Sequence, residues 1–290
     1  MSPFDVCVVG SANLDIVATT RRHPRPGETV HGIDYHEYPG GKGLNQAVAA
    51  ARSGSTVTFV GALGDDAAAD ALRAVLGADA IDDRLVDTSE ATGRAIIVVD
   101  ESGENSIVVV AGANAAVSVG TGLPAARVVL CQLEIPLPTV AAALRASREF
   151  GGTTILNPAP ADRLPLDLLA SCDVIVPNEH EVALLGGVEH LLTAGCGAVV
   201  VTRGGNGVDV HTSARIEHLD AFEVDVVDTT GAGDAFCGAL ASRLAAGDDL
   251  VEAARWATAA GALATTVRGA VPAQPSAEAI SALLVHEGDG

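Results

Sequence analysis

Short runs of apolar, largely β-branched residues alternate with alanine- and leucine-rich segments along most of the chain. We predict strands at the apolar runs, which are Val6–Val9, Thr56–Val60, Val128–Leu130, Thr153–Leu156, Val174–Val176 and Ala198–Thr202. These runs are continuously apolar, as in strands that are covered on both faces. We predict helices at Gly43–Ser53, Ala67–Leu76, Leu137–Glu149, Glu179–Leu185, Ala232–Ala246, Leu250–Thr265 and Ser276–His286. This order indicates an α/β fold, a three-layer sandwich with a mostly parallel central sheet.

Two regions depart from the alternation of strands and helices. Leu14–Thr20 and Thr29–Tyr38 are strand-like and flank a turn rich in proline and glycine, and Arg94–Asp100 with Ser106–Val110 reads as a hairpin. We therefore expect a small extra β-sheet, built from segments of about 14–38 and 94–110, that covers the carboxyl edge of the main sheet as a lid. No repeat or long linker divides the chain, so we expect residues 1–290 to form a single domain.

The charge balance limits the function. The chain carries 37 acidic and 17 basic side chains, a formal net charge of −20. This argues against generic nucleic-acid binding and excludes a polybasic membrane anchor. The longest uncharged stretch, Asn105–Ala126, contains glycines and a proline, which favour a strand and a loop over a membrane helix.

The cysteines and the N-terminal residues indicate a cytoplasmic protein. The five cysteines are scattered and form no Cys-x-x-Cys pair, which argues against a disulfide framework and a structural zinc site. The first residues lack the basic and apolar regions of a signal peptide. A reducing compartment fits this cysteine usage.

The strongest local signal is the sequence Asp228–Phe236, which reads Asp-Thr-Thr-Gly-Ala-Gly-Asp-Ala-Phe. We predict that it follows a strand at Phe222–Val227 and opens the helix that begins at Ala232. Two glycines and a helix N-terminus would expose backbone N–H groups to an anion such as a phosphate. Asp234 would lie in the first helical turn, where its carboxylate can accept a proton from a hydroxyl group. The alternative is an ordinary glycine turn with Asp234 as a helix cap.

The sequence Gly40–Asn45 also opens a predicted helix, and it holds the one lysine of the chain, Lys42. Its glycines permit close approach of a ligand, and Lys42 and Asn45 supply hydrogen-bond donors. The spacing is not that of a phosphate-binding P-loop. Asn13 and Asp15, directly after the first strand, could bind sugar hydroxyls or could form a turn at the strand end.

Two loops after later strands are further candidates. Asn178 and Glu181 would share a helix face and could order water around a magnesium ion, or Asn178 could simply cap the helix. The glycine-rich loop Thr202–Gly207 could surround a nucleotide or could be a hairpin turn.

Taken together, these motifs resemble those of the PfkB carbohydrate kinase family, and of its ribokinase branch in particular. Asp228–Asp234 is similar to the C-terminal motif of the family, and Gly40–Ala49 is similar to its N-terminal motif. The segments that resemble the ribokinase branch are Gly103–Asn105, Ala111–Ala115, Gln132–Glu134 and Asn157–Pro160. The resemblance covers nearly the whole chain in the same order, and it implies a ribokinase-like fold in which the lid sheets of two subunits form a homodimer.

The resemblance also implies a role for individual residues. D-ribose would be held by Asn13, Asp15, Gly41, Lys42, Asn45, Glu134 and Asp234. Catalysis would involve Asp234 as the base, with Gly231, Ala232 and Gly233 at the developing charge. ATP phosphates and magnesium-bound water would lie near Asn178, Glu181, Thr202, Gly204 and Gly207, and the adenine base near Thr258. A monovalent-cation loop would comprise Asp228, Thr230, Ala264, Val267 and Gly269.

This chain departs from the pattern of the family in three places. Ala273 stands at a cation-loop position where well-known members have a hydroxyl residue, which makes activation by potassium less certain than catalysis. The segments 115–127 and 182–197 are short for the ribokinase branch. Since both shortened segments avoid the motifs, we expect altered edges of the fold and a retained reaction.

The reaction that the resemblance implies is the ATP-dependent phosphorylation of the O5 hydroxyl of D-ribose, with magnesium at the phosphates. Two alternatives remain open from the sequence. One is another kinase of the family that acts on deoxyribose, fructose or a nucleoside. The other is a sugar-binding regulator on the same fold that has no catalytic activity.

Overall fold

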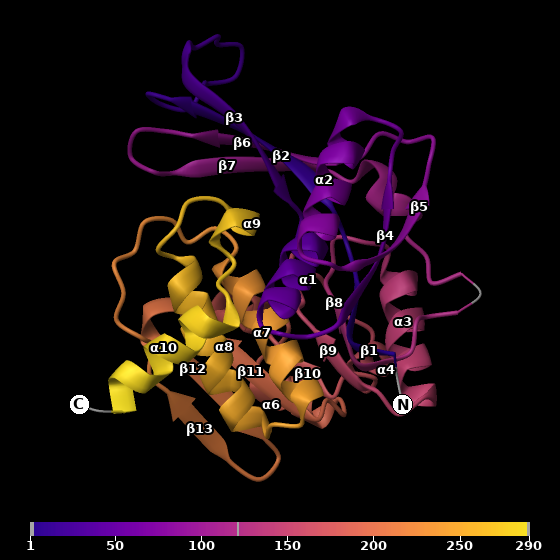
Figure 1. The fold of residues 1–290 in the computed structure, drawn as a ribbon. Coiled ribbons are helices and arrows are strands. Elements are labelled where there is room, and N and C mark those ends of the chain that lie inside the picture. Colours follow the sequence, from indigo (N-terminus) through magenta and orange to yellow (C-terminus); the bar gives the residue numbers. More distant parts are fainter. Residues whose placement is uncertain (1–2, 121, 289–290) are drawn as a thin grey trace.

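A nine-stranded sheet forms the centre of the molecule in this computed structural model, which describes residues 3–120 and 122–288 (Figure 1). In spatial order its strands are β13 (Ile216–Leu219), β12 (Val208–Thr212), β11 (Ala198–Thr202), β10 (Val174–Ile175), β9 (Thr153–Leu156), β8 (Ala126–Cys131), β1 (Phe4–Val9), β4 (Val57–Leu63) and β5 (Asp82–Asp87). The strands from β11 to β5 run parallel, and β12 and β13 add an antiparallel edge. The mostly parallel sheet predicted from the apolar runs is confirmed.

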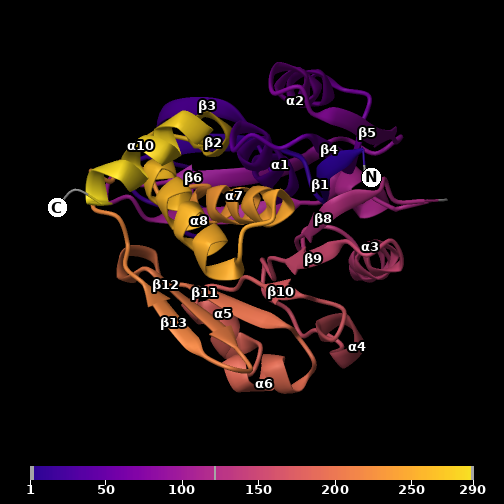
Figure 2. The same ribbon diagram turned by 60° about the horizontal axis from the view of Figure 1, so that its bottom comes forward.

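Helices cover both faces of this sheet (Figure 2). One face carries α1 (Lys42–Arg52), α2 (Ala67–Ala78), α7 (Ala232–Ala246) and α8 (Leu250–Ala264), with α10 (Ala277–Gly288) packed on α8. The other face carries α3 (Leu137–Glu149), α4 (Leu166–Leu169), α5 (Glu179–Leu184) and α6 (Val188–Thr193). In β1, Val6 and Val8 belong to the first core and Cys7 and Val9 to the second. Strand β1 is continuously apolar because both of its faces are buried.

A separate four-stranded sheet stands above the end of α1 in Figure 1. Its order is β3 (Gly32–Gly40), β2 (Asn13–Thr20), β6 (Gly93–Val99) and β7 (Asn105–Val110). Strands β2 and β3 are inserted between β1 and α1, and β6 and β7 between β5 and β8. This is the small lid sheet that the two irregular regions of the sequence predicted, and it leads directly into α1.

One predicted strand is wrong. Phe222–Val227 alternates apolar and acidic residues, yet it forms no strand. The backbone N–H groups of Val227 and of Asp228 both donate to the carbonyl of Thr265, which follows α8, and not to a neighbouring strand. The alternation has another cause, because Phe222, Val224 and Val226 line a cavity beneath this extended segment.

The structure also contains elements that the sequence did not predict. Strand β5 is polar and lies at a sheet edge, and β12 and β13 form the antiparallel edge at the other side. The remaining additions are the short helices α4, α6 and α9 (Ala270–Ala273), and the 3₁₀ turns η1 (Gly112–Ala116) and η2 (Gly204–Asn206). The short stretch between Glu181 and Ala198 contains the end of α5 and all of α6, and each of these helices has six residues. Within the described ranges, no helix is long and apolar enough to span a membrane.

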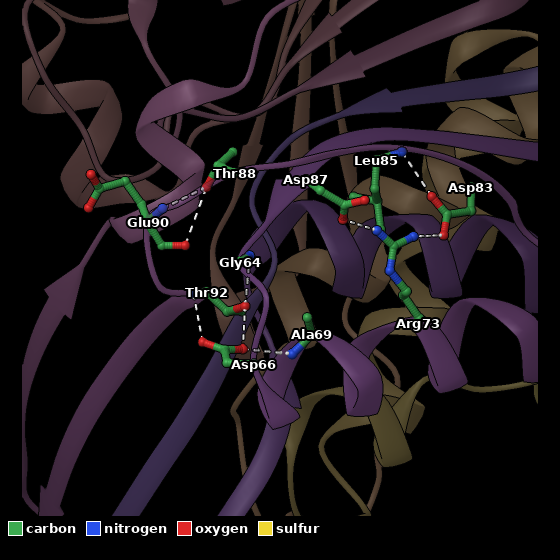
Figure 3. A network of polar contacts seen from close by, with 10 residues as sticks. All are labelled: Gly64, Asp66, Ala69, Arg73, Asp83, Leu85, Asp87, Thr88, Glu90 and Thr92. Carbon is green, nitrogen blue, oxygen red and sulfur yellow. Dashed lines mark hydrogen bonds and ion pairs between the residues drawn. The ribbon is translucent and has the colours of Figure 1, made fainter.

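Asp66 connects helix α2 to the start of the lid strand β6 (Figure 3). Its carboxylate caps α2 by accepting a hydrogen bond from the Ala69 N–H at 3.0 Å, and it accepts two more from the Thr92 hydroxyl at 2.7 Å and the Thr92 N–H at 3.0 Å. Burial alone would raise the pKa of Asp66, but these hydrogen bonds outweigh burial and hold the pKa below its ordinary value. The charged form of Asp66 therefore stabilises the fold.

We predict that Asp66→Ala lowers the free energy of unfolding by about 2 kcal/mol at pH 7, because it removes a helix cap and two hydrogen bonds to a charged group. Since the pKa of Asp66 is lowered by folding, its stabilising effect is present above the unfolded-state pKa and is lost on acidification. The difference should therefore shrink as the pH falls below 3.8. Urea unfolding at several pH values measures it.

Arg73, further along α2, provides a matched control (Figure 3). Its guanidinium pairs with Asp83 at 2.5 Å and Asp87 at 2.6 Å, but its side chain is 34% exposed. Exposed ion pairs contribute little, so Arg73→Met should change the free energy of unfolding by less than ~1 kcal/mol. Equal effects of the two substitutions would contradict the special role of Asp66.

Candidate active site

The first turn of α1 lies against the connection from β1 to β2. Gly41 caps α1 with φ of 91°, and a Cβ atom at this position would lie 2.7 Å from the backbone nitrogen of Asn13. Glu134, which follows β8, accepts hydrogen bonds from the Lys42 N–H at 3.2 Å and from the Ser11 hydroxyl at 2.6 Å. A carboxylate at a helix N-terminus is favoured by the helix dipole. Glu134 therefore joins three separate parts of the chain at this point.

Asn13 and Asp15 lie at the beginning of the lid strand β2. The side-chain oxygen of Asn13 accepts a hydrogen bond from the Asn114 amide at 2.7 Å, so it is the NH₂ group of Asn13 that stays available to a ligand. A Cβ atom at Gly40 would lie 2.1 Å from an oxygen of the Asp15 carboxylate. The close approach of β3 to Asp15 therefore requires glycine at position 40.

Four carboxylates and one ammonium group interact in this region. Burial raises the pKa of Asp15 to about 7, the charges of Glu134 and Asp234 add to the rise, and Lys42 partly offsets it. Burial alone would lower the pKa of Lys42, but Asp234, Glu134 and Glu181 outweigh burial and raise this pKa, so Lys42 is charged at neutral pH. The site thus holds one fixed positive charge and a carboxyl group that titrates near neutrality.

Asp234 lies in the first turn of α7, as predicted. Gly231 precedes this helix in the left-handed conformation, with φ of 76°. The Asp234 carboxylate is 6% exposed and accepts a hydrogen bond at 2.9 Å from each of two side chains of α1, Asn45 and Gln46. Helix capping by the Asp234 side chain, the alternative left open by the sequence, is absent from the hydrogen bonds of the described residues.

The start of α7 also presents backbone donors. Helix geometry supplies no carbonyl partner for the N–H groups of the first turn, which include Gly233 and Asp234. The N–H group of Ala232 instead donates to the carbonyl of Thr229 at 3.3 Å. Of the segment Gly231–Asp234 predicted to face a developing charge, Gly233 and Asp234 are thus the residues whose amides the helix leaves available.

Two adjoining cavities meet at this glycine turn. The first has a volume of about 230 Å³ and is lined by Lys42, Asn157, Asn178, Glu181, Asp234 and Cys237, among others. The second has a volume of about 260 Å³ and is mostly apolar, with Val208, Phe222, Val224, Phe236, Thr258 and Gly261 in its lining. Thr202, Thr229 and Gly233 line both cavities. A polar ligand group in the first cavity can therefore continue into a flat apolar group in the second.

Asn178 and Glu181 form a capping box at the start of α5. The Asn178 side chain accepts a hydrogen bond from the Glu181 N–H, and the Glu181 carboxylate accepts one from the Asn178 N–H, both at 2.8 Å. The capping alternative for Asn178 is therefore correct, yet both residues still line the first cavity. Burial raises the pKa of Glu181, and the hydrogen bond from Asn178 and the charge of Lys42 counteract this.

The glycine-rich loop Thr202–Gly207 joins the antiparallel strands β11 and β12, so the hairpin interpretation of this loop is correct. The loop also borders the apolar cavity through Thr202, Gly204 and Gly207. Thr258 of α8 borders the same cavity, and its hydroxyl donates to the Ala254 carbonyl at 2.8 Å.

The residues of the predicted cation loop also lie together. The Asp228 carboxylate accepts hydrogen bonds from the N–H groups of Thr230 and Gly269, each at 2.9 Å. Ala264 ends α8 immediately before this loop and packs with Ala235 and Ala273 in a small apolar cluster. Val267 belongs to the same loop and is 45% exposed. The side chain of Ala273 therefore makes apolar contacts in this cluster and supplies no oxygen atom to the loop.

Sequence reasoning missed the buried amides around Asp234. Gln46, Gln132 and Asn157 are each 9% exposed or less, and they form a hydrogen-bonded chain that ends at the Asp234 carboxylate. The signal was available, because Gln46 follows Asn45 in the N-terminal motif, and Gln132 and Asn157 begin segments that resemble the ribokinase branch. The role of Gln46 was missed because adjacent residues on a helix point in different directions, and Asn45 and Gln46 were not expected to bind the same carboxylate.

Comparisons with known proteins identify the family of this chain. A family model described as pfkB family carbohydrate kinase matches residues 4–277. A ribokinase of Staphylococcus aureus is 36% identical, and the match covers 95% of this chain and 98% of that protein. A bifunctional ribokinase/ribose-5-phosphate isomerase A of Fructilactobacillus sanfranciscensis is 41% identical over 95% of this chain, which spans 55% of that longer protein. A deoxyribokinase of Salmonella typhi is 34% identical over 97% of this chain and 99% of its own.

Solved structures are similar over the whole chain. The ribokinase of Thermotoga maritima has a TM-score of 0.90 and 34% identity, and the match covers 97% of this chain and 99% of that one. An Arabidopsis thaliana ribokinase complexed with ribose and ATP has a TM-score of 0.86 and 32% identity, with 98% and 99% covered. The ribokinase-like fold expected from the sequence is thereby confirmed. With its family model, its relatives and its fold in agreement, the chain belongs to the PfkB family of carbohydrate kinases.

Proposed function

We propose that this protein is a ribokinase, which transfers the γ-phosphoryl group of ATP to the O5 hydroxyl of D-ribose. The observation that carries the proposal is the buried Asp234 carboxylate, held by two amide donors at the N-terminus of α7 and bordering a polar cavity. This arrangement puts a proton acceptor beside N–H groups that favour phosphoryl oxygens. The polar and apolar cavities that meet at Gly233 suit the phosphates and the base of a nucleotide.

In the proposed reaction Asp234 takes the proton of the sugar hydroxyl. The hydroxyl oxygen forms a bond to the γ-phosphorus while the bond from that phosphorus to ADP breaks, and ADP leaves with the electron pair. Asn13, Asp15, Gly41, Lys42, Asn45 and Glu134 would orient the sugar. The N–H groups of Gly233 and Asp234, with Gly231 and Ala232 shaping the turn, would stabilise the developing negative charge.

Magnesium would be held by the phosphates and by water near Asn178 and Glu181. Among the described residues, no group of three or more His, Cys, Asp or Glu side chains is placed to bind a metal ion directly. Magnesium in nucleotide sites typically keeps several waters and uses one or two protein carboxylates with the substrate phosphates, so Glu181 at the cavity wall fits this mode. When bound, the ion neutralises charge on the phosphates.

A monovalent cation, potassium by resemblance, would sit at the loop of Asp228, Thr230, Ala264, Val267 and Gly269. Backbone carbonyls and the Asp228 carboxylate are the oxygen ligands that such an ion prefers. Ala273 contributes no oxygen from its side chain. We therefore propose weaker activation by potassium than in a protein with a hydroxyl residue at this position.

The lid supports two further proposals. We propose that the two sheets form one catalytic domain, because β2 carries Asn13 and Asp15 and β3 continues directly into α1. We also propose a homodimer through the lid sheets. All six residues of β7 are exposed, and four consecutive apolar residues among them, Ile107–Val110, are 50–61% exposed. Large exposed apolar surfaces typically mark protein interfaces.

A cytoplasmic location is proposed from the cysteines. All five are unpaired and buried, and burial is the largest cause of the raised pKa of each of them. Such thiols are stable in a reducing compartment.

A substrate screen tests the proposed function. We expect ADP release, measured with a coupled assay, to be fastest with D-ribose among pentoses, hexoses and nucleosides. Deoxyribose lacks one of the hydroxyls of ribose. If the site binds that hydroxyl, a buried polar group of the protein has no partner when deoxyribose is bound, and the reaction with deoxyribose is slower. Higher kcat/KM with deoxyribose, fructose or a nucleoside would assign another kinase of the family, and no ADP release with any of these sugars would support a regulator.

Asp234→Asn tests the catalytic base. We expect kcat with ribose to fall by about 10²–10⁴-fold, because the amide cannot accept the hydroxyl proton. Nucleotide binding, measured by calorimetry, should change little. Asp70→Asn, which alters an exposed carboxylate on α2, is the control and should leave kcat unchanged. Activity of Asp234→Asn within a few-fold of wild type would contradict the role of Asp234.

The titration of Asp15 predicts the pH dependence of sugar binding. Only the ionised carboxylate can accept hydrogen bonds from two sugar hydroxyls, and the pKa of Asp15 is about 7 in the free protein. The Kd for ribose, measured by calorimetry without ATP, should therefore be about tenfold higher at pH 6 than at pH 8. Asp15→Asn should bind more weakly and should lose most of this dependence. A Kd that is constant between these pH values in the wild-type protein would overturn the assignment.

A further inference from the structure

A chain of buried side-chain amides links the central sheet to Asp234. Gln132 follows β8, Gln46 belongs to α1, and Asn157 follows β9. The Gln132 NH₂ group donates to the side-chain oxygen of Gln46 at 2.5 Å. The Gln46 NH₂ group donates to Asp234 Oδ1 at 2.9 Å and to Asn157 Oδ1 at 3.1 Å. Gln46 and Gln132 are 0% exposed, so these groups have no access to solvent.

The partners of Gln46 fix the orientation of its amide. Its oxygen faces a donor from Gln132, and its nitrogen faces two acceptors. Asn157 is fixed as well, because its NH₂ group donates to the Val176 carbonyl at 2.9 Å and leaves its oxygen toward Gln46. Turning the Gln46 amide over would break its hydrogen bonds to Asp234 and Asn157 and would bring its oxygen against the Asp234 carboxylate. The bond to Gln132 could form again, because the Gln132 side-chain oxygen has no hydrogen-bond partner among the described residues and this amide can turn as well. In a solvent-free site the loss of the other two hydrogen bonds is costly.

The two oxygens of Asp234 therefore differ. Oδ1 accepts a hydrogen bond from the Gln46 NH₂ group, whose orientation is fixed. A proton on Oδ1 would be repelled by the hydrogen of this donor. Oδ2 accepts a hydrogen bond from Asn45 at 2.9 Å. The other amide atom of Asn45, its Oδ1, is buried and finds no hydrogen-bond partner among the residues that the structure describes. Asn45 can thus turn over to accept a hydrogen bond from a proton on Oδ2 without losing any other hydrogen bond.

We propose that Gln46 is a positioning residue for the reaction, which the chain from Gln132 orients so that Oδ2 of Asp234 takes the substrate proton. This inference rests on the proposed function, in which Asp234 is the base. The proton moves from the sugar hydroxyl to Oδ2, the hydroxyl oxygen bonds to the γ-phosphorus, and ADP leaves with the electrons of the broken bond. Gln46 itself gives up no proton, and it holds the carboxylate through Oδ1.

Gln132→Glu tests the proposal at a residue that does not touch Asp234. When protonated, the introduced carboxyl group can donate to the Gln46 oxygen and preserve the native orientation. When ionised, it can only accept, which favours the reversed Gln46 amide with its oxygen toward Asp234. We expect the ratio of kcat of this variant to kcat of wild type to fall at least fivefold from pH 6 to pH 9. Gln132→Met should give a lower ratio that is independent of pH.

Gln46→Met separates positioning from binding. We expect kcat to fall at least tenfold while KM for ribose and for ATP stays within threefold, because the carboxylate loses orientation and the ligand contacts remain. Ser147→Ala, a change at another fully buried polar side chain on α3, controls for lost stability and should leave both parameters unchanged. Thermal unfolding of each variant checks that it is folded, and if Gln46→Met does not fold, the two Gln132 variants decide.

The outcomes also distinguish this proposal from the proposed function. Suppose that Asp234→Asn loses activity, that the ratio of kcat of Gln132→Glu to kcat of wild type does not change with pH, and that Gln46→Met keeps its kcat. Asp234 then remains the base, and the proposed role of Gln46 and Gln132 in orienting it is refuted. If Asp234→Asn keeps its activity, both proposals fail.

Discussion

The contact between α1 and α7 is the constraint on which the rest of the site depends. The two helices come from opposite ends of the chain, and Gly238 allows them to meet closely, since a Cβ atom there would lie 2.4 Å from the Gln46 carbonyl. This contact places Asn45 and Gln46 on one side of the Asp234 carboxylate. The N-terminus of α1 is fixed in turn by Glu134 and by the close approach of Gly41 to the β1–β2 connection. The residues proposed to bind the sugar and those proposed to bind the phosphates are therefore held by a single packing arrangement.

The charged groups concentrated at this contact are unfavourable for folding, and in the proposed function they would bind the sugar. Burial raises the pKa of Asp15 to about 7, the charges of Glu134 and Asp234 add to the rise, and the ammonium group of Lys42 partly offsets it. In the proposed function, a bound polyol would supply further hydroxyl donors to these carboxylates. Lys42 is the counter-charge for all of them, which gives a physical reason for a lysine at this position in a chain whose other basic residues are arginines. A compact ammonium group fits between carboxylates where a forked guanidinium needs more room.

The sequence predicted most of the fold because its strongest signals were local. The apolar runs are strands of the main sheet, and the proline- and glycine-rich interruptions are turns of the lid. The helix starts that carry Lys42 and Asp234 were predicted because each follows closely spaced glycines in the sequence. The features that the sequence did not predict depend on tertiary contacts. The alternating run Phe222–Val227 lines a cavity and pairs with no strand, and β5 is an edge strand whose charged residues concealed it. Gln46 was overlooked because only the packing of α1 on α7 turns it toward Asp234.

A crystal structure of the protein with D-ribose and a non-hydrolysable ATP analogue tests the central claim most directly. The account predicts the O5 hydroxyl within about 2.6–3.2 Å of Asp234 Oδ2, in line with the γ-phosphorus, with Oδ1 still bound to the Gln46 amide. A sugar bound away from Asp234, or one whose O5 hydroxyl contacts Oδ1 while Oδ2 faces the protein, would contradict it.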